Sequence, residues 1–348
     1  MTHITWDTGT AYDFFISLFV LHHATEIGLR PSWAAGVRQR ISAPRREFLE
    51  QFFSFSGLPL PWIRSLPEPK DAATVLHYAA DLAPVDRLAA LTLSSESVPE
   101  VEATLRSIAR RGSWKANEEQ LLKEHYPKRA RALTSEGLTA MLQTWAAGKQ
   151  SGENLLAALQ EYFEAFFVEE ENRIRPALES GLAQAQKRAR QVSIERLVEE
   201  LSHGIRFEDI GTIQELVLAP SYWMTPLVFH MRPTAQTALI VFGVRPELES
   251  IPPGAGKPDA LVTTLKSLAD PTRLRILRYL NDQPLTPSEL SRRLRLRPPT
   301  VIHHLNMLRL AGLVFITISE DGDKRYTTRS ETVNTLFNTV QEFISKQD

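Results

Sequence analysis

The sequence predicts a mainly α (α+β) protein, in which a large helical N-terminal domain with a small β region precedes a C-terminal winged helix-turn-helix. Two observations predict this class. The stretch from Leu268 to Val314 carries the caps and the apolar spacing of three short consecutive helices, followed by alternating residues. Residues 1 to about 203 carry mostly helical signals, and β-branched runs are concentrated between about 205 and 244.

The first two helices of the C-terminal segment have clear start signals. Asp270 precedes Pro271, a pair typical of a helix N-terminus, because proline lacks an N–H that would have no partner there. Thr286 and Glu289 have capping-box spacing and start a second, shorter helix. The inward face of the first helix is predicted from apolar residues at helical spacing, namely Leu274, Ile276, Leu277 and Leu280.

The third helix is the predicted reader of a duplex. Its inward face is predicted from spacing i, i+4 and i+7, at Val301, Leu305 and Leu308. The outward face then carries Pro299, Ile302, His303 and Asn306. After Gly312 the apolar period changes to two, and a turn at Asp321–Gly322 separates two short strands. These strands predict a wing.

Charge is unevenly spread along the 348 residues, although the net charge is only −1. From Pro258 onward there are thirteen Lys and Arg against ten Asp and Glu, whereas the rest of the chain has 27 against 31. The stretch from Leu290 to Ser319 contains five arginines and no carboxylate. Such a cluster suits the release of counterions from a phosphate backbone, although a solvated helix face is the simpler explanation.

The segment from about Asp259 to the C-terminus resembles the ArsR-like winged-helix family of prokaryotic transcriptional regulators. The resemblance rests on LKSLADPTRLRILRYL, on TVIHHLNMLRLAGLV and on the strand-turn-strand that follows. Two positions depart from the family pattern, because Arg295 stands where a turn glycine is usual and Arg297 where a helix-capping serine is usual. A strained or differently shaped turn is therefore expected. The acidic wing tip, Glu320 to Asp323, predicts weak phosphate contacts.

The resemblance implies double-stranded DNA as the partner and repression as the usual mode of action. It places Pro299, Thr300, Ile302 and His303 against bases or phosphates in the major groove, with Ile302 able to touch a thymine methyl. Cationic side chains are assigned to phosphates, which position a protein without specifying sequence. The predicted DNA-binding residues are Arg293, Arg297, Pro299, Thr300, Ile302, His303, Asn306, Lys324 and Arg325.

The last helix, from about Ser330, predicts a homodimer. Its apolar stripe needs a partner surface, and the leucines before the helix-turn-helix are expected to pair with it. Two-fold symmetry of such a dimer matches an inverted-repeat operator. The predicted dimerisation residues are Leu261, Leu265, Leu268, Leu336, Phe337, Val340, Phe343 and Ile344.

Proline and glycine divide the chain into three parts. Residues 1–245 form the predicted N-terminal domain, residues 246–258 form a Pro/Gly-rich linker, and residues 259–348 form the DNA-binding and dimerisation domain. In the first part, Ser97 and Glu100 predict a capping box and Ser193 predicts a helix start. The longest helical segment spans residues 153–189, where Pro176 predicts a kink or break.

The N-terminal domain carries no common catalytic or nucleotide-binding motif, so the protein is expected not to be an enzyme. All six tryptophans precede the linker, and either core packing or a small-molecule effector pocket explains this aromatic set. The domain is expected to sense a small molecule or to modulate the dimer. Its closest resemblance is to uncharacterised N-terminal regions ahead of ArsR-like winged helices, suggested by YDFFISLFVLHH, GLRPSWAAGVRQR and VLAPSYW; it implies no ligand.

The absence of cysteine excludes disulfides and thiolate metal sites. His22, His23 and Glu26 have spacing that a metal could use, but a histidine pair at a helix end more often has a capping or hydrogen-bonding role, and no metal or cofactor is predicted. The apolar run from Phe14 to Leu21 is too short to cross a bilayer, and no signal peptide is evident. A cytoplasmic protein that does not contact membranes is therefore expected.

Two alternatives to a transcriptional regulator remain open at this stage. The first is an enzyme that uses the winged helix only to dimerise, as in methyltransferases with a similar module, although these place it before a glycine-rich loop that is missing here. The second is a scaffold that binds another protein through the reader helix. The cluster of five arginines favours DNA over the scaffold.

Overall fold

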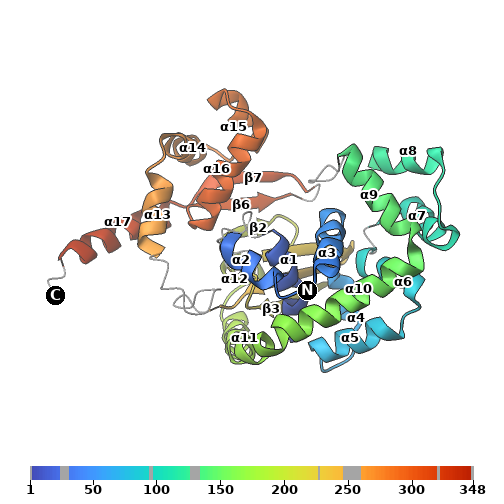
Figure 1. Cartoon of the computed structure of the whole chain (residues 1–348). Coiled ribbons are helices and arrows are strands. Elements are labelled where there is room, and N and C mark those ends of the chain that lie inside the picture. Colours follow the sequence, from blue (N-terminus) through green and yellow to red (C-terminus); the bar gives the residue numbers. More distant parts are fainter. Residues whose placement is uncertain are drawn as a thin grey trace.

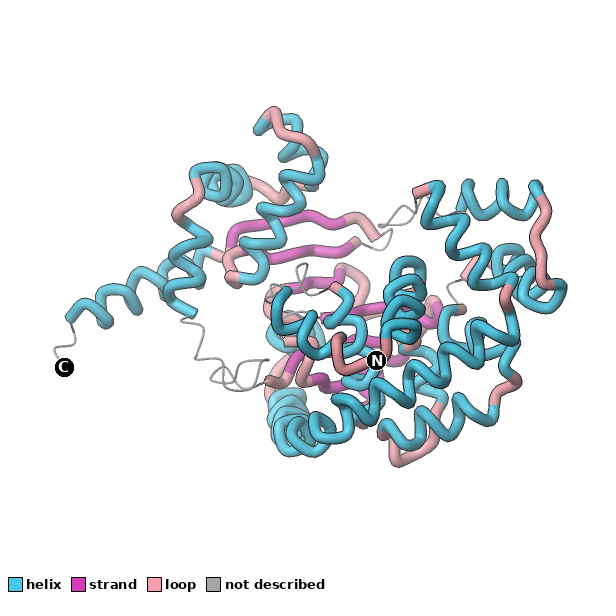
Figure 2. Tube along the Cα trace, viewed as in Figure 1, coloured by secondary structure: helices cyan, strands magenta, loops and turns pink. Residues whose placement is uncertain are grey.

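The computed structural model shows a mostly helical protein with two small sheets (Figure 1, Figure 2). It describes residues 2–23, 31–93, 97–125, 134–225, 228–245, 260–319 and 322–345. The predicted class, mainly α with a small β region and a C-terminal helix-turn-helix, is confirmed. The predicted linker at 246–258 lies outside the described residues.

Helices make up most of the N-terminal half. In chain order they are α1 (Thr10–His22), α2 (Pro31–Arg38), α3 (Ala43–Phe55), α4 (Leu60–Ser65), α5 (Ala72–Asp81), α6 (Pro84–Thr92), α7 (Pro99–Arg111), α8 (Ala116–His125), α9 (Ser135–Ala146), α10 (Gly148–Tyr162), the π-helical segment η3 (Phe163–Phe167), α11 (Val168–Ala189) and α12 (Ile194–Leu201).

A four-stranded sheet of order β1-β3-β5-β4 lies within this half. Its strands are β1 (His3–Trp6), β3 (Glu215–Ser221), β4 (Val228–Thr234) and β5 (Thr237–Gly243). Strands β1, β3 and β5 are parallel, and β4 runs antiparallel to β5. Both faces of the central strands are buried, which is typical of parallel strands. Strands lie in the predicted region near 205–244, whereas β1 is an addition that the sequence pattern did not predict.

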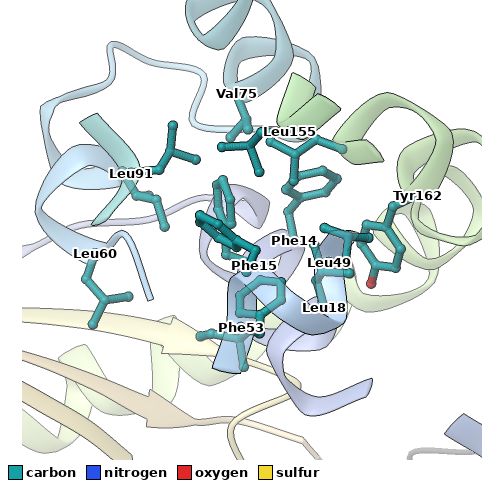
Figure 3. Close-up of a cluster of buried hydrophobic side chains, with 14 of the residues drawn as sticks. Phe14, Phe15, Leu18, Leu49, Phe53, Leu60, Val75, Leu91, Leu155 and Tyr162 are labelled. Atoms are coloured by element: carbon teal, nitrogen blue, oxygen red, sulfur yellow. The ribbon is translucent and has the colours of Figure 1, made fainter. Parts of the chain in front are cut away.

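Helix α1 forms the centre of the larger apolar core, which Figure 3 shows in close-up. Phe14, Phe15 and Leu18 are almost fully buried, and their neighbours come from several helices. The Phe14 ring meets the rings of Phe167 and Tyr162 at centroid distances of 5.1 and 5.5 Å. The apolar run that begins at Phe14 is therefore a buried helix.

Asp13 fastens this central helix to the end of β3. Its carboxylate accepts hydrogen bonds from Ser221 Oγ (2.6 Å), Trp223 N (2.8 Å) and Tyr222 N (3.2 Å). The side chain is completely buried, and burial raises its pKa to about 7 against the lowering effect of these hydrogen bonds. The position of α1 on the sheet therefore depends on a buried, titratable group.

The helix boundaries predicted from the sequence of the N-terminal half are confirmed only in part. Ser193 accepts a hydrogen bond from Arg196 N (3.3 Å) and caps α12, as predicted. The predicted capping box of Ser97 is wrong, because α7 starts at Pro99 with Val98 as its N-cap and no side-chain cap. A residue before proline prefers an extended backbone, which places the start one residue later. Of the kink or break predicted at Pro176, the break is wrong, because α11 continues through this residue, and the kink stays a prediction.

The C-terminal part consists of a helix-turn-helix, a wing and two flanking helices. Its elements are α13 (Ala260–Leu268), α14 (Pro271–Asp282), α15 (Pro287–Leu294), α16 (Pro298–Leu310), β6 (Val314–Ile318), β7 (Lys324–Thr328) and α17 (Ser330–Ser345). Asp270 accepts from Arg273 N (2.9 Å) and caps α14. The capping box of Thr286 and Glu289 is present at the start of α15. Both predicted starts are confirmed.

Arg295 ends α15 in a left-handed backbone conformation, with φ 57° and ψ 41°. Its own N–H bonds to the carbonyl of Ser291, and the next N–H, of Leu296, bonds to the same carbonyl at 3.1 Å. Left-handed geometry favours glycine because a Cβ atom is strained there. The predicted strained turn is therefore present.

The smaller strand β2 (Ile205–Phe207) joins the wing instead of the N-terminal sheet. It pairs in parallel with β6, giving a second sheet of order β2-β6-β7. A second apolar core includes the face of the four-stranded sheet that carries Leu216 and Ile240, the α12–β2 segment, and the helix-turn-helix. The two halves of the chain thus share one apolar core.

Replacing Asp13 by Asn is expected to change how stability depends on pH. The ordinary pKa is 3.8 and the folded value is about 7, so between these values the folded protein retains a proton that the unfolded chain releases. The stabilising contribution is full below the ordinary pKa and is lost as the pH rises through the folded value. Urea unfolding at pH 5 and pH 7 should show Asp13→Asn gaining about 1 kcal/mol per pH unit relative to wild type.

The exposed Asp81→Asn variant is the control and should keep the wild-type pH dependence. An Asp13→Asn difference that does not change with pH would contradict the raised pKa.

Replacing Arg295 by Gly is expected to raise the free energy of unfolding by about 1 kcal/mol, because glycine takes the left-handed backbone without strain. The matched control is Arg292→Gly, which puts glycine inside the same helix and should lower stability by about 1 kcal/mol. Thermal unfolding of both variants tests this. Equal destabilisation by both glycines would contradict the strain at Arg295.

Candidate nucleic-acid interface

Helix α16 has one buried and one exposed face. Its inward residues Val301, Leu305 and Leu308 are fully buried, as predicted, and the helix packs against α14, α15 and β6. Ile302 on the opposite face is 45% exposed. All the predicted base-facing residues are exposed on this helix, namely Pro299, Thr300, Ile302, His303 and Asn306.

The N-terminus of α16 combines the positive end of the helix dipole with a positively charged side chain. Arg297 is the N-cap and its side chain makes no capping hydrogen bond, in agreement with the missing serine. Pro298 and Pro299 occupy the first turn, where the lack of an N–H costs nothing. The start of the helix therefore presents an exposed guanidinium beside the positive end of the helix dipole, an arrangement that favours a phosphate.

Four of the five clustered arginines are exposed around the turn between α15 and α16: Arg292, Arg293, Arg295 and Arg297. Arg293 lies over the Tyr279 ring at 5.8 Å, so its guanidinium is held against α14. With its amide oriented to satisfy both groups, Gln283 accepts from the same guanidinium at 2.9 and 2.6 Å. The turn thus carries several cations, and the guanidinium of Arg293 is held in one orientation by its neighbours.

Arg309 does not belong to this exposed group. It is half-buried at the other end of α16, and burial lowers its pKa although Tyr326 acts in the opposite direction. The sequence could not separate it from the other arginines, because its burial comes from the wing and not from neighbouring residues in the chain.

The wing contributes the last two predicted phosphate contacts. Lys324 and Arg325 are exposed at the start of β7. Partial desolvation lowers the pKa of Lys324, and repulsion from Arg309 lowers it further. Arg325 lies 3.7 Å from Glu289, a carboxylate that already serves the capping box of α15. The acidic tip residues Glu320 and Asp321 lie outside the described part of the chain.

His304 packs inward while its neighbour His303 projects outward. The His304 ring is half-buried with Nδ1 3.8 Å from Asp270 Oδ1, and burial lowers its pKa although Asp270 acts in the opposite direction. The histidine therefore joins the capping residue of α14 to α16. This contact fixes the first helix of the motif relative to the third and leaves only His303 available to a ligand.

Helices α13 and α17 pack on each other and extend away from the body of the protein (Figure 1). Among the predicted dimerisation residues, Leu336 is buried, whereas Phe337 and Ile344 are 59% and 76% exposed. Leu261, Leu265, Leu268 and Val340 are half-buried, and the side chain of Phe343 lies outside the description. Leu274, predicted inside, is 50% exposed because it lies at the edge of the buried stripe of α14.

The histidine pair of α1 is packed against aromatic rings. His22 stacks on Phe53 and His23 on Phe19, with centroid distances of 5.4 and 4.1 Å. Burial lowers the pKa of His22 to about 3. Glu26 lies outside the described residues, among which no group of three or more His, Cys, Asp or Glu is placed to hold a metal.

Two tryptophans of the N-terminal half, Trp145 and Trp223, are buried. A hollow of about 30 Å³ beside Trp145 and Val101 has room for about one water molecule. A wider, open hollow lies on the surface of α7, where Arg106, Arg110 and Arg111 are paired with carboxylates. No helix in the described ranges is both long and apolar enough to cross a membrane.

Comparison with known proteins agrees with this geometry. Residues 270–314 match the family described as bacterial regulatory protein, arsR family. The solved structure of reduced HlyU from Vibrio cholerae is 32% identical over 25% of this chain and 90% of that chain, with a TM-score of 0.20, so the similarity rests on sequence. No curated protein matches the chain. The C-terminal part of this chain therefore belongs to the arsR family of bacterial regulatory proteins, with its helix-turn-helix at residues 270–314.

Proposed function

We propose that this protein is a DNA-binding transcriptional regulator, which acts as a homodimeric repressor on an inverted-repeat operator. The observation that carries the proposal is the exposed face of α16, which presents apolar and polar side chains from Ile302 to Asn306 beside arginines at its start. No carboxylate occurs from Leu290 to Ser319. Such a face suits the major groove, where side chains read base edges and cations neutralise phosphates.

Roles within the interface follow from position on the motif. Ile302, His303 and Asn306 occupy the middle of the exposed face and are assigned to bases, with Ile302 against a thymine methyl. Pro299 and Thr300 in the first turn lie where the helix enters the groove. Four cations are assigned to phosphates, Arg293 and Arg297 at the turn and Lys324 and Arg325 on the wing.

Dimerisation is assigned to α13 and α17. Phe337 and Ile344 are exposed on α17 one heptad apart. Exposure of these apolar side chains to water is unfavourable, and a second copy of the protein would cover them. A two-fold dimer presents two reader helices to successive major grooves. The N-terminal half is assigned the regulation of this dimer, either through a small-molecule effector or through dimer geometry, because it shares an apolar core with the DNA-binding part.

The double variant Arg293→Ala, Arg297→Ala tests the phosphate contacts. It is expected to weaken binding to every duplex and to reduce the slope of log affinity against log salt by about 1 per lost contact. Fluorescence anisotropy over a salt series measures both. The control removes two exposed arginines of the N-terminal half, Arg110 and Arg175, and should keep the parent slope. If the slope of the double variant also stays unchanged, the assignment is wrong.

Charging the exposed face of α17 tests the dimer. Phe337→Glu with Ile344→Glu should give a monomer, because each carboxylate would have to be buried without a partner. Light scattering reports the mass, and operator affinity should fall at least tenfold as one half-site is lost. The control, Asn334→Glu with Gln341→Glu, uses exposed polar positions at the same spacing. A double variant that remains dimeric places the interface elsewhere.

A further inference from the structure

The wing is a three-stranded sheet because the N-terminal half supplies one of its strands. One side of β7 is covered by Leu285, whose N–H bonds to Tyr326 O (3.0 Å) and whose carbonyl accepts from Tyr326 N (2.8 Å). The other side of β7 pairs with β6, which leaves β6 as the outer strand of the wing. Strand β2 covers this outer edge and, within the described residues, pairs with no other strand.

Backbone hydrogen bonds fix the register of the added strand. Ile316 N donates to Gly204 O (3.0 Å), and Glu208 N donates to Ile318 O (3.1 Å). Arg206 is the middle residue of β2 and lies opposite Thr317. An uncovered edge strand would leave these backbone groups to water or to another chain. The sequence-remote segment 205–207 therefore completes the ladder of the wing.

Side chains hold β2 on both faces of the sheet. On the inner face, Ile205 and Phe207 are 4% and 9% exposed, and Phe207 meets the ring of His230 on β4 at 5.0 Å. On the outer face, two guanidiniums lie near the Phe315 ring, 3.9 Å away for Arg206 and 5.2 Å away for Arg329. The cation–π contact of Arg206 adds to the ladder. Release of β2 would therefore expose apolar surface and break all of these contacts.

The segment that connects the N-terminal core to β2 is short and is held in place by ion pairs. Helix α12 packs on α11 through Arg188, whose guanidinium binds Glu200 at 2.6 and 2.8 Å. Three residues, Ser202, His203 and Gly204, separate α12 from β2, and the last two have positive φ. Glu199 on α12 also pairs with Arg206 of β2. Because these contacts are direct, a shift of α11 or α12 would also move β2 and, through its pairing with β6, the wing.

We propose that β2 is the regulatory contact of this protein: paired with β6, it holds the wing and the end of α16 in the DNA-binding position, and its release lowers DNA affinity. This inference rests on the proposed function. It goes further in naming the three-residue strand through which the N-terminal half acts. It also implies that a ligand or partner that displaces α12 would switch the regulator without touching the reader helix.

A cysteine cross-link tests the paired state in the intact protein. The chain has no cysteine, so Arg206→Cys with Thr317→Cys allows a single disulfide within one chain. Directly paired residues on neighbouring strands have Cα separations in the range that disulfides accept. The oxidised protein is expected to bind duplex DNA within about twofold of the reduced protein or more tightly. Failure to form the disulfide, or a tenfold loss on oxidation, would overturn the proposal.

A proline variant tests the released state. Arg206→Pro removes the amide hydrogen from the middle of β2, whereas the matched Arg206→Ala removes only the guanidinium and keeps the backbone donor. Hydrogen exchange at Ile316 and Ile318 should become at least tenfold faster in Arg206→Pro and remain slow in Arg206→Ala. Operator affinity should fall at least tenfold in the proline variant alone.

The two readouts separate the two claims. Faster exchange with unchanged DNA affinity would show that β2 pairs with the wing without controlling DNA binding, and it would overturn the inference while leaving the proposed function intact. Absence of DNA binding by the parent protein would refute the proposed function. Hydrogen exchange would still report in that case whether β2 covers β6.

Discussion

The apolar core shared by the two halves of the chain is the constraint on which the other features depend. It runs from the face of the four-stranded sheet that carries Leu216 and Ile240, past Ile205, to the inward residues of the helix-turn-helix such as Leu305. Burying these side chains against one another fixes where α16 lies relative to the N-terminal half. Helix α16 therefore shares a packed core with the N-terminal half.

The chemistry expected of a nucleic-acid interface follows from how α16 is held. Its inward face is locked by Val301, Leu305 and Leu308, and His304 reaches the cap of α14, so the remaining faces are free for a ligand. The exposed arginines are concentrated at the turn before the helix, while Arg309 at the other end of the helix is half-buried beside the wing. A chain with a net charge of −1 can therefore present a strongly basic surface at one place.

Features set by neighbouring residues could be predicted from the sequence. The caps at Asp270, Thr286 and Ser193 are present, and the inward stripe of α16 and the left-handed turn at Arg295 follow their local signals. The capping box at Ser97 failed because the proline after Val98 moved the start of the helix, and Leu274 lies just beyond the buried stripe. Each of these errors is a shift of about one position.

Features set by distant parts of the chain could not be predicted. Strand β2 has only three residues, and its partner β6 is more than a hundred positions away, so no local pattern reveals the pairing. The exposed and buried arginines look alike in sequence, and only the packing of the wing separates Arg309 from the others. Likewise, the buried Asp13 gains its role from Ser221 and Trp223, which the fold alone brings to it.

The central claim is that two copies of α16 read duplex DNA. Footprinting the full-length protein on fragments selected from a genomic library tests it most directly. Protection is expected at two inverted half-sites whose centres lie about 10 base pairs, or a small multiple of this, apart. The protection should disappear when Ile302, His303 and Asn306 are replaced by alanine. A footprint that survives this triple replacement, or no protected site even at low salt, would contradict the claim.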